Sequence, residues 1–276
     1  MGTVEQPSAE RQVIRPSVSV IIPVYNDAGG VALCLRALRE QTYPRERFES
    51  IVIDNGSNPD LATIAREFPE VRIEREEMPG SYSARNKGLL VARGEIIAFT
   101  DADCIPQPQW LEKGVASLLE VDNCGLVAGA VEFVFESENG GSIYELYDSM
   151  FYFNQMDYVT RGRFACTANA FTRASVVHQV GGFDERLRSI GDREWGNRIA
   201  AAGYRQIFAP ESVVLHPPRS PLNAHLKKRL RLAGGQHDFT QRKRLRFLRL
   251  INALRRQLVR DPLVVAGALL REAGKM

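Results

Sequence analysis

The sequence lacks the features that mark several protein classes. Its four cysteines stand far apart, and none of them forms a CxxC pair. A chain of 276 residues does not need disulfides to hold its core together. It contains no internal repeat, and its glycines and prolines are scattered, which excludes collagen-like and low-complexity proteins. We therefore expect an ordinary globular protein with reduced, buried thiols.

Long apolar runs are also missing. The first sixteen residues hold no apolar stretch of the kind that a signal peptide needs. The longest uncharged run near the C-terminus, 262–270, has nine residues, about half of what a membrane-spanning helix requires. Gln6 stands where a myristoylation motif has Ser or Thr. From these absences we expect a cytoplasmic protein.

Charge is spread unevenly along the chain. The formal net charge is +3, but segment 226–260 holds twelve Lys or Arg against the single acid Asp238, so it carries +11 and the remainder −8. Apolar residues fall at helical spacing within this basic segment, at Leu245, Leu248, Ile251, Leu254 and Leu258. Such a helix either lies on an anionic membrane surface or packs on the domain. We expect no nucleic-acid partner, because no binding module is recognisable.

Strand and helix patterns alternate in the first half of the chain. We expect strands at 17–22, 50–54, 71–74 and 95–100, and helices at 29–40 and 81–93, with a further helix starting at Asn58–Pro59. This alternation predicts an α/β fold with a mostly parallel central sheet flanked by helices. After Gly125 the pattern loosens, and it becomes helical again after Pro221. We expect a polar leader at 1–16, one domain at 17–235 and a basic helical extension at 236–276.

Acidic side chains follow several of the predicted strands. Asp54 ends the second strand, and Asp101 and Asp103 follow the fourth. Ligands of such sheets bind beyond the carboxyl ends of the strands, where these carboxylates would repel each other without a cation. Asp101 and Asp103 are two residues apart and can point the same way, which suits Mg²⁺ or Mn²⁺. A lone DxD is also common in surface turns.

Phosphate-binding glycine motifs are absent, since neither GxGxxG after the first strand nor GxxxxGK[ST] occurs. Four other segments carry a resemblance: SVIIPVYND (19–27), IVIDNGS (51–57), SARNKGL (83–89) and FTDAD (99–103). In this order and spacing they resemble the motifs of family 2 inverting glycosyltransferases. The resemblance covers about 17–235 and implies the GT-A fold, a single nucleotide-diphospho-sugar domain.

The resemblance implies roles on the donor side of the site. It assigns the nucleoside and its diphosphate to Pro23, Val24, Tyr25, Asp54, Arg85, Asn86 and Asp101. A carboxylate at position 54 can accept the imide N–H of a uracil-like base, and Arg85 can donate to ribose or diphosphate. Two alternatives stay open: Tyr25 packs in the core, and Arg85 forms an ordinary surface ion pair.

The resemblance also implies the catalytic and metal residues. The segment GDREW (191–195) resembles the family's ED motif, whose aspartate is the base, although Gly191 replaces the usual Glu. We therefore expect Asp192 to be the base; its alternative role is a helix cap. Mn²⁺ or Mg²⁺ is expected on Asp103, Asp101 and His216. The acceptor region is expected around Asn169, Gly182, Glu194 and Trp195.

Together these features predict a metal-dependent inverting glycosyltransferase. It would move a sugar from a nucleoside diphosphate donor, with uridine favoured, to a hydroxyl on a glycan or lipid-linked acceptor. Transfer is expected to be non-processive, because segment 241–245 lacks the tryptophan of QxxRW. Two rivals remain: a nucleotidyltransferase, which would carry a basic loop after the first strand, and a degenerate sugar-nucleotide-binding scaffold.

Overall fold

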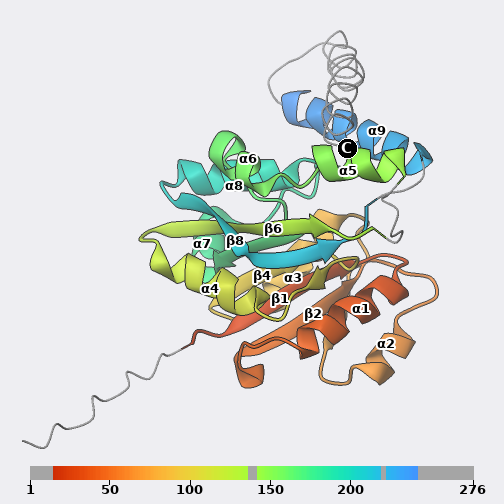
Figure 1. The fold of residues 1–276 in the computed structure, drawn as a ribbon, viewed down its shortest axis with the longest axis vertical. Coiled ribbons are helices and arrows are strands. Elements are labelled where there is room, and N and C mark those ends of the chain that lie inside the picture. Colours follow the sequence, from red (N-terminus) through yellow and green to blue (C-terminus); the bar gives the residue numbers. More distant parts are fainter. Residues whose placement is uncertain (1–14, 136–141, 219–221, 242–276) are drawn as a thin grey trace, which may run out of the picture.

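The computed structural model describes residues 15–135, 142–218 and 222–241. One eight-stranded sheet, in the order β3-β2-β1-β4-β7-β6-β8-β5, runs through this part of the chain with helices on both faces (Figure 1). Residues 1–14 and 242–276 lie outside the described residues, and with them most of the predicted leader and most of the predicted amphipathic helix.

The first half folds as the strand and helix patterns predict. Its strands β1 (Val18–Val24), β2 (Phe48–Asp54), β3 (Arg72–Arg75) and β4 (Ile96–Thr100) are parallel to one another. The connections are α1 (Ala28–Arg39), the 3₁₀ turn η1 (Arg45–Arg47), α2 (Ala62–Glu67) and α3 (Ser81–Val91). The parallel strands therefore end at one edge, as a ligand site of this type requires.

The expected helix start at Asn58–Pro59 is wrong. The helix α2 begins at Ala62, whose N–H is bound by the Asp60 side chain at 3.1 Å. The N–H of Asn58 instead donates to the side-chain oxygen of Asn26 at 2.8 Å, which ties this loop to the end of β1. A tertiary hydrogen bond thus overrides a local capping pattern.

The second half changes strand direction. It comprises β5 (Ile105–Pro106), α4 (Trp110–Glu120), β6 (Cys124–Phe133), α5 (Ile143–Phe151), α6 (Gln155–Asp157), the π-helical turn η2 (Tyr158–Gly162), β7 (Asn169–Arg173), α7 (Ala174–Val180), α8 (Gly191–Ala201), β8 (Arg205–His216) and α9 (Leu222–Gln241). Strand β7 is antiparallel to both β4 and β6, whereas β6 and β8 are parallel. The sheet is therefore parallel from β3 to β4 and mixed beyond it.

Apolar side chains of the sheet alternate between two cores. Val20 and Ile22 of β1 face the core beneath α1, α2 and α4, while Ile21 faces the core beneath α3 and α8. Each fully buried aliphatic side chain contributes about 1.5–3 kcal/mol through the hydrophobic effect. All four cysteines are free thiols; Cys34, Cys104 and Cys124 are buried as expected, whereas Cys166 is half-buried. This double packing holds the strand ends rigidly.

Helices α5 and α9 lie side by side beyond the sheet (Figure 1). Lys228 of α9 lies 3.4 Å from the buried carboxylate of Asp148 in α5, and its ammonium sits 3.2 Å from the ring centroid of Tyr152. Among the described residues, no helix combines the length and the hydropathy needed to cross a bilayer. The α5–α9 pair covers one side of the candidate site.

Candidate functional site

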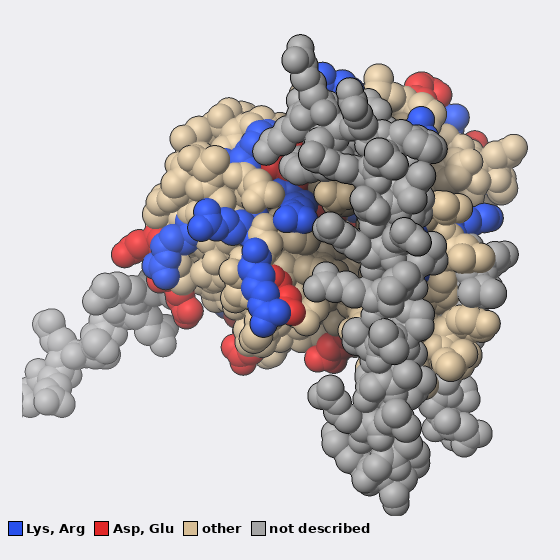
Figure 2. Space-filling view, turned by 90° about the horizontal axis from the view of Figure 1, so that it is seen from above, with Lys and Arg blue, Asp and Glu red and all other residues tan. Residues whose placement is uncertain are grey.

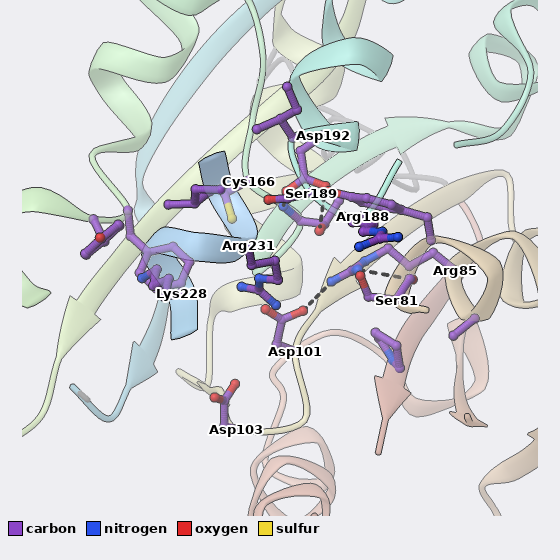
Figure 3. Close-up of a pocket in the computed structure, with 18 of the residues that line it drawn as sticks. Ser81, Arg85, Asp101, Asp103, Cys166, Arg188, Ser189, Asp192, Lys228 and Arg231 are labelled. Atoms are coloured by element: carbon purple, nitrogen blue, oxygen red, sulfur yellow. Dashed lines mark hydrogen bonds and ion pairs between the residues drawn. The ribbon is translucent and has the colours of Figure 1, made fainter. Parts of the chain in front are cut away.

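A cavity of about 610 Å³ opens beyond the carboxyl ends of β1 and β4. Its wall combines the end of β1, the start of α3, the loop after β4, the first turn of α8 and one side of α9. The charged side chains in the wall are Asp27, Arg85, Asp101, Asp103, Arg188, Asp192, Arg193, Lys228 and Arg231. All of them except Asp27 and Arg193 are labelled in Figure 3. The structure thus gathers several of the predicted donor and metal residues and the predicted base from separate parts of the chain.

Arg85 and Asp101 form an ion pair at the floor of this cavity. A short hydrogen bond joins Nη2 of Arg85 to Oδ1 of Asp101, and Nη1 donates to the Ser81 carbonyl at 3.2 Å. The Arg85 side chain is 6% exposed and that of Asp101 30%. The Nε of Arg85 is buried without a hydrogen-bond partner. The surface ion pair considered from the sequence is therefore wrong, because this pair is largely buried inside a cavity.

Asp103 lines the cavity, and buried His216 lies behind it. Nε2 of His216 lies 3.4 Å from Oδ2 of Asp103, and it is buried without a hydrogen bond. Nδ1 lies 2.6 Å from the Pro217 carbonyl, which can only accept, so Nδ1 carries the proton and donates. In the neutral ring Nε2 would carry the lone pair beside the Asp103 carboxylate, which is how a ligating histidine is oriented by its other nitrogen.

This pair fits a hard divalent cation. Asp103, His216 and the Cys104 thiol are the described residues whose ligand atoms cluster within 4.8 Å. Burial, followed by the nearby carboxylates of Asp101 and Asp103, raises the pKa of Cys104 well above its usual value, so the thiol stays neutral. The remaining oxygen and imidazole donors suit Mn²⁺ or Mg²⁺. Asp101, predicted as a further ligand, lies outside this cluster and pairs with Arg85.

Asp192 lies in the first turn of α8 and faces the cavity. Thr167 donates to its carboxylate through Oγ1 at 3.3 Å and through its N–H at 3.5 Å. Burial raises the pKa of Asp192, Arg85 opposes that rise, and Asp101 adds to it. The capping alternative is wrong, because the N-cap is Ile190 and no side chain caps this helix. A carboxylate with a raised pKa inside a cavity is suited to accept a proton.

The glycine before Asp192 has a packing reason. A Cβ at Gly191 would lie 2.6 Å from Cζ of Tyr82, whose ring fills the space where a side chain would go. The Gly191 N–H also donates to the Tyr82 hydroxyl at 2.8 Å. Tyr82 of α3 therefore occupies the volume that the side chain of the expected Glu would need.

The nucleoside residues are placed in part. Pro23, Val24 and Tyr25 line the cavity, and Tyr25 is 65% exposed, so the core-packing alternative for it is wrong. Asp54 is buried and does not line the cavity. Its carboxylate accepts from the Ser57 N–H at 2.8 Å and pairs with Arg75 at 3.3 Å. The contact between Asp54 and a base stays a prediction.

Asn86 does not line this cavity. Its amide donates to the Phe183 carbonyl at 2.8 Å and to Glu185 at 2.7 Å, and its oxygen accepts from the Phe183 N–H at 2.7 Å. These bonds fix the loop before α8. In this structure Asn86 is a positioning residue for that loop.

The predicted acceptor residues lie apart from the cavity wall. Asn169 is fully buried and bonds to the Trp110 indole and to the carbonyls of β6 and β8. Trp195 is buried, and its indole donates to the Gly181 carbonyl at 3.0 Å. Gly182 and Glu194 border a separate, open hollow. The structure therefore does not bring these four residues together at the cavity.

Sequence reasoning missed several residues of the wall. Arg188, Arg193 and Arg231 reach it from the α8 region and α9, and Phe151, Tyr152, Phe153, Tyr158 and Phe164 add an aromatic side. The excess of positive charge after residue 226 pointed to Arg231, but we interpreted that charge as a membrane-binding feature. The aromatic residues belong to no recognisable sequence motif, because they lie in an irregular connection without a regular spacing.

Known proteins share the sequence of this chain in part. The model described as "Glycosyl transferase family 2" matches residues 19–181. Glycosyltransferase AglE of Haloferax volcanii is 43% identical over 227 residues, 80% of this chain and 73% of that protein. A pre-mycofactocin glycosyltransferase of Mycobacterium tuberculosis is 28% identical, and the match covers 84% of this chain but only about half, 49%, of that protein.

Solved structures share the fold. The mannosyltransferase PcManGT of Pyrobaculum calidifontis, in complex with GDP-Man and Mn²⁺, superposes with a TM-score of 0.61 at 23% identity, covering 95% of this chain and 76% of that one. S. aureus TarS in complex with UDP-GlcNAc gives 0.56 at 19% identity, covering 74% and 59%. At these identities the likeness concerns the fold.

Proposed function

Because the chain belongs to glycosyl transferase family 2 and is an enzyme of glycosyl transfer, we propose that it moves one sugar at a time from a nucleoside diphosphate donor to a hydroxyl acceptor, with inversion and with a divalent cation. The GT-A fold expected from the motifs is confirmed. The observation that carries the proposal is the convergence of Asp192, the Arg85–Asp101 pair and Asp103 on one cavity, with buried His216 behind Asp103.

Asp192 acts as the general base in this proposal. Its carboxylate takes the proton of the acceptor hydroxyl while the oxygen attacks the anomeric carbon. The two bonds from Thr167 fix the orientation of the carboxylate. The raised pKa strengthens the carboxylate as a proton acceptor, and it also predicts that activity falls on the acidic side of that pKa.

Asp103 and His216 hold the cation, and Arg85 holds the phosphates. A divalent cation bound there supplies positive charge to the leaving diphosphate. Arg85 keeps an unpartnered Nε, and Asp101 fixes the guanidinium in place. A planar guanidinium can donate to two phosphate oxygens at once. Because these groups are held by the packed core, they need little rearrangement when the donor binds.

The base of the donor is a separate question. Exposed Tyr25 lies at the cavity mouth and offers a ring on which a base can stack. Uridine is our first choice, on the resemblance of the first two motifs. The related folds are described with either a guanosine or a uridine sugar nucleotide, PcManGT with GDP-Man and TarS with UDP-GlcNAc, so both bases belong in the test.

A thermal-shift panel tests this proposal. UDP-sugars and GDP-sugars are added with Mn²⁺, and the measurement is repeated with a chelator. A selective donor raises the melting temperature by mass action, by an amount worth about 2.7 kcal/mol at a hundredfold excess over its Kd. Chelation should abolish both this shift and the release of nucleotide. Tight binding without any turnover would instead support the scaffold.

A cytoplasmic location at a membrane surface is part of the proposal. The basic segment 226–260 supports it, since each Lys or Arg near an anionic bilayer contributes about 1 kcal/mol. Sedimentation with anionic liposomes, with and without residues 242–276, measures this directly. Equal binding by the truncated and full chains would contradict it.

A further inference from the structure

Three arginines around the cavity have no acidic partner among the described residues. Arg188, Arg193 and Arg231 line it and are exposed, and among the described side chains no carboxylate forms an ion pair with any of them. Nearby arginines behave differently: Arg186 pairs with Asp184 at 2.9 Å, and Arg198 with Glu194 at 2.9 Å. Figure 2 shows several Lys and Arg side chains gathered near the centre of the face that carries α9. The three arginines are thus available to an anion.

These arginines lie close to the proposed base. Arg188 comes four residues before Asp192 and Arg193 directly follows it, while Arg231 approaches from α9. Figure 3 shows Arg188 and Arg231 entering the cavity from different elements, with Asp192 on the same cavity wall. The first turn of α8 adds the positive end of a helix dipole. An anion bound there sits beside the group that receives the acceptor's proton.

The donor diphosphate already has its own partners. Arg85 and Asp103 line the cavity, and His216 adjoins Asp103. Lys228 is held by Asp148, and Asp101 neutralises Arg85. The positive charge of the three arginines is not neutralised by any of these donor-side groups. Their position points to the second substrate.

An aromatic surface lies in the same cavity. Tyr158 and Phe164 stack at 4.8 Å with their planes 16° apart, and Phe151, Tyr152 and Phe153 continue this surface. Aromatic rings offer an apolar face, whereas arginine forks recognise oxyanions through paired hydrogen bonds. A ligand that satisfies both walls has an apolar face and a negatively charged group.

We propose that the acceptor carries an oxyanion, a carboxylate or a phosphate, close to its reacting hydroxyl, and that Arg188, Arg193 and Arg231 bind it. This inference rests on the proposed function. The hydroxyl proton passes to Asp192, the oxygen bonds to the anomeric carbon, and the bond to the diphosphate oxygen breaks, its electrons leaving with the nucleoside diphosphate. The oxyanion itself is unchanged and holds the hydroxyl in line.

Binding of matched sugars to the nucleotide-loaded protein tests the inference. The full chain is saturated with Mn²⁺ and with UDP or GDP, whichever raises its melting temperature. It is then titrated calorimetrically with methyl glucoside, methyl glucuronide and glucose 6-phosphate. We expect one or both anions to bind at least about tenfold more tightly than the neutral sugar, since hydrogen bonds to charged groups are worth more than neutral ones. Glucuronide binding indicates a carboxylate, and glucose 6-phosphate binding a phosphate.

Substitutions locate the binding. Arg188→Gln, Arg193→Gln and Arg231→Gln should each weaken the anion about tenfold and leave nucleotide affinity unchanged. Lys227→Gln is the matched control, because Lys227 is exposed on α9 and does not line the cavity. All four are surface positions, so their melting temperatures should stay close to that of the wild type.

Several results would overturn the inference. Equal affinity for charged and neutral sugars contradicts an oxyanion, and full binding by the arginine variants contradicts these residues. Displacement of the nucleotide by the anion would assign the arginines to the donor instead. A chain that binds no nucleotide with Mn²⁺ contradicts the proposed function rather than this inference.

Discussion

Replacing Gly191 with alanine tests the packing beneath the proposed base. The added Cβ would lie 2.6, 2.7 and 2.9 Å from three ring carbons of Tyr82. The ring has little freedom to withdraw: it is 8% exposed, it stacks on Phe183 at 5.7 Å, and its hydroxyl accepts the Gly191 N–H. Overpacking of this kind costs about 1–3 kcal/mol. At about 2–4 °C per kcal/mol for a chain of this size, the melting temperature should fall by about 2–12 °C.

The same substitution should impair catalysis. Relief of the clash requires the first turn of α8 to move, and Asp192 moves with it. A displacement of about 1 Å in a catalytic group can cost about a hundredfold in rate. Nucleotide release from the donor, measured at saturating Mn²⁺, should therefore fall even where the variant remains folded.

Two controls make this prediction specific. Gly29 is also near the start of a helix, but a Cβ there meets nothing within 4 Å, so Gly29→Ala should be neutral or stabilise by up to about 1 kcal/mol. In a Tyr82→Ala background, Gly191→Ala should cost no further stability, because the obstructing ring is gone. If Gly191→Ala proved as stable as Gly29→Ala, the predicted clash with Tyr82 would be refuted.

Three further predictions concern the charged groups of the cavity. Asp101→Asn leaves the buried charge of Arg85 without its partner and should lower the free energy of unfolding in urea by about 2–3 kcal/mol, somewhat less than for a fully buried pair. As a control, Glu67→Gln breaks the exposed pair with Arg36 and should lower it by under about 1 kcal/mol. His216→Gln should weaken the apparent affinity for Mn²⁺ in thermal scans at least about tenfold. Because the His216 ring is buried against Phe133 and Phe153, the metal-free melting temperature should fall as well, so the shift caused by Mn²⁺ is measured from each variant's own metal-free value. Because the pKa of Asp192 is raised in the folded state, the wild type loses stability as pH rises from the ordinary value of 3.8 through the folded-state pKa. Asp192→Asn has no such carboxyl group and should therefore be more stable than wild type at neutral pH. The difference should disappear below pH 3.8.

Much of the fold follows from local patterns. The alternation of strands and helices up to β4 could be predicted because each element has its own period and stop signal. The antiparallel β7 could not, because its direction depends on a long irregular connection rather than on its own residues. The start of α2 was also misplaced, since the bond between Asn58 and Asn26 joins residues distant in sequence.

The candidate site divides in the same way. Motif residues at strand ends, such as Asp101 and Asp103, line the cavity because the sheet edge brings them there. Asn86 and Asn169 were also predicted as site residues, yet their side-chain amides donate hydrogen bonds to backbone carbonyls instead of facing the cavity. A motif identifies a segment, and packing decides which of its side chains face the ligand. The arginine at position 231 needed the tertiary structure, because only the docking of α9 on α5 places it over the cavity.

The central claim is that Asp192 removes the acceptor's proton beside a donor held by the rest of the cavity. The most direct measurement is the rate of donor turnover by Asp192→Asn, with Mn²⁺ present and the donor's Kd determined on the same protein. The account predicts a rate about 10²–10⁴-fold below that of wild type, with donor affinity nearly unchanged. Turnover close to the wild-type rate, with the donor equally well bound, would contradict it.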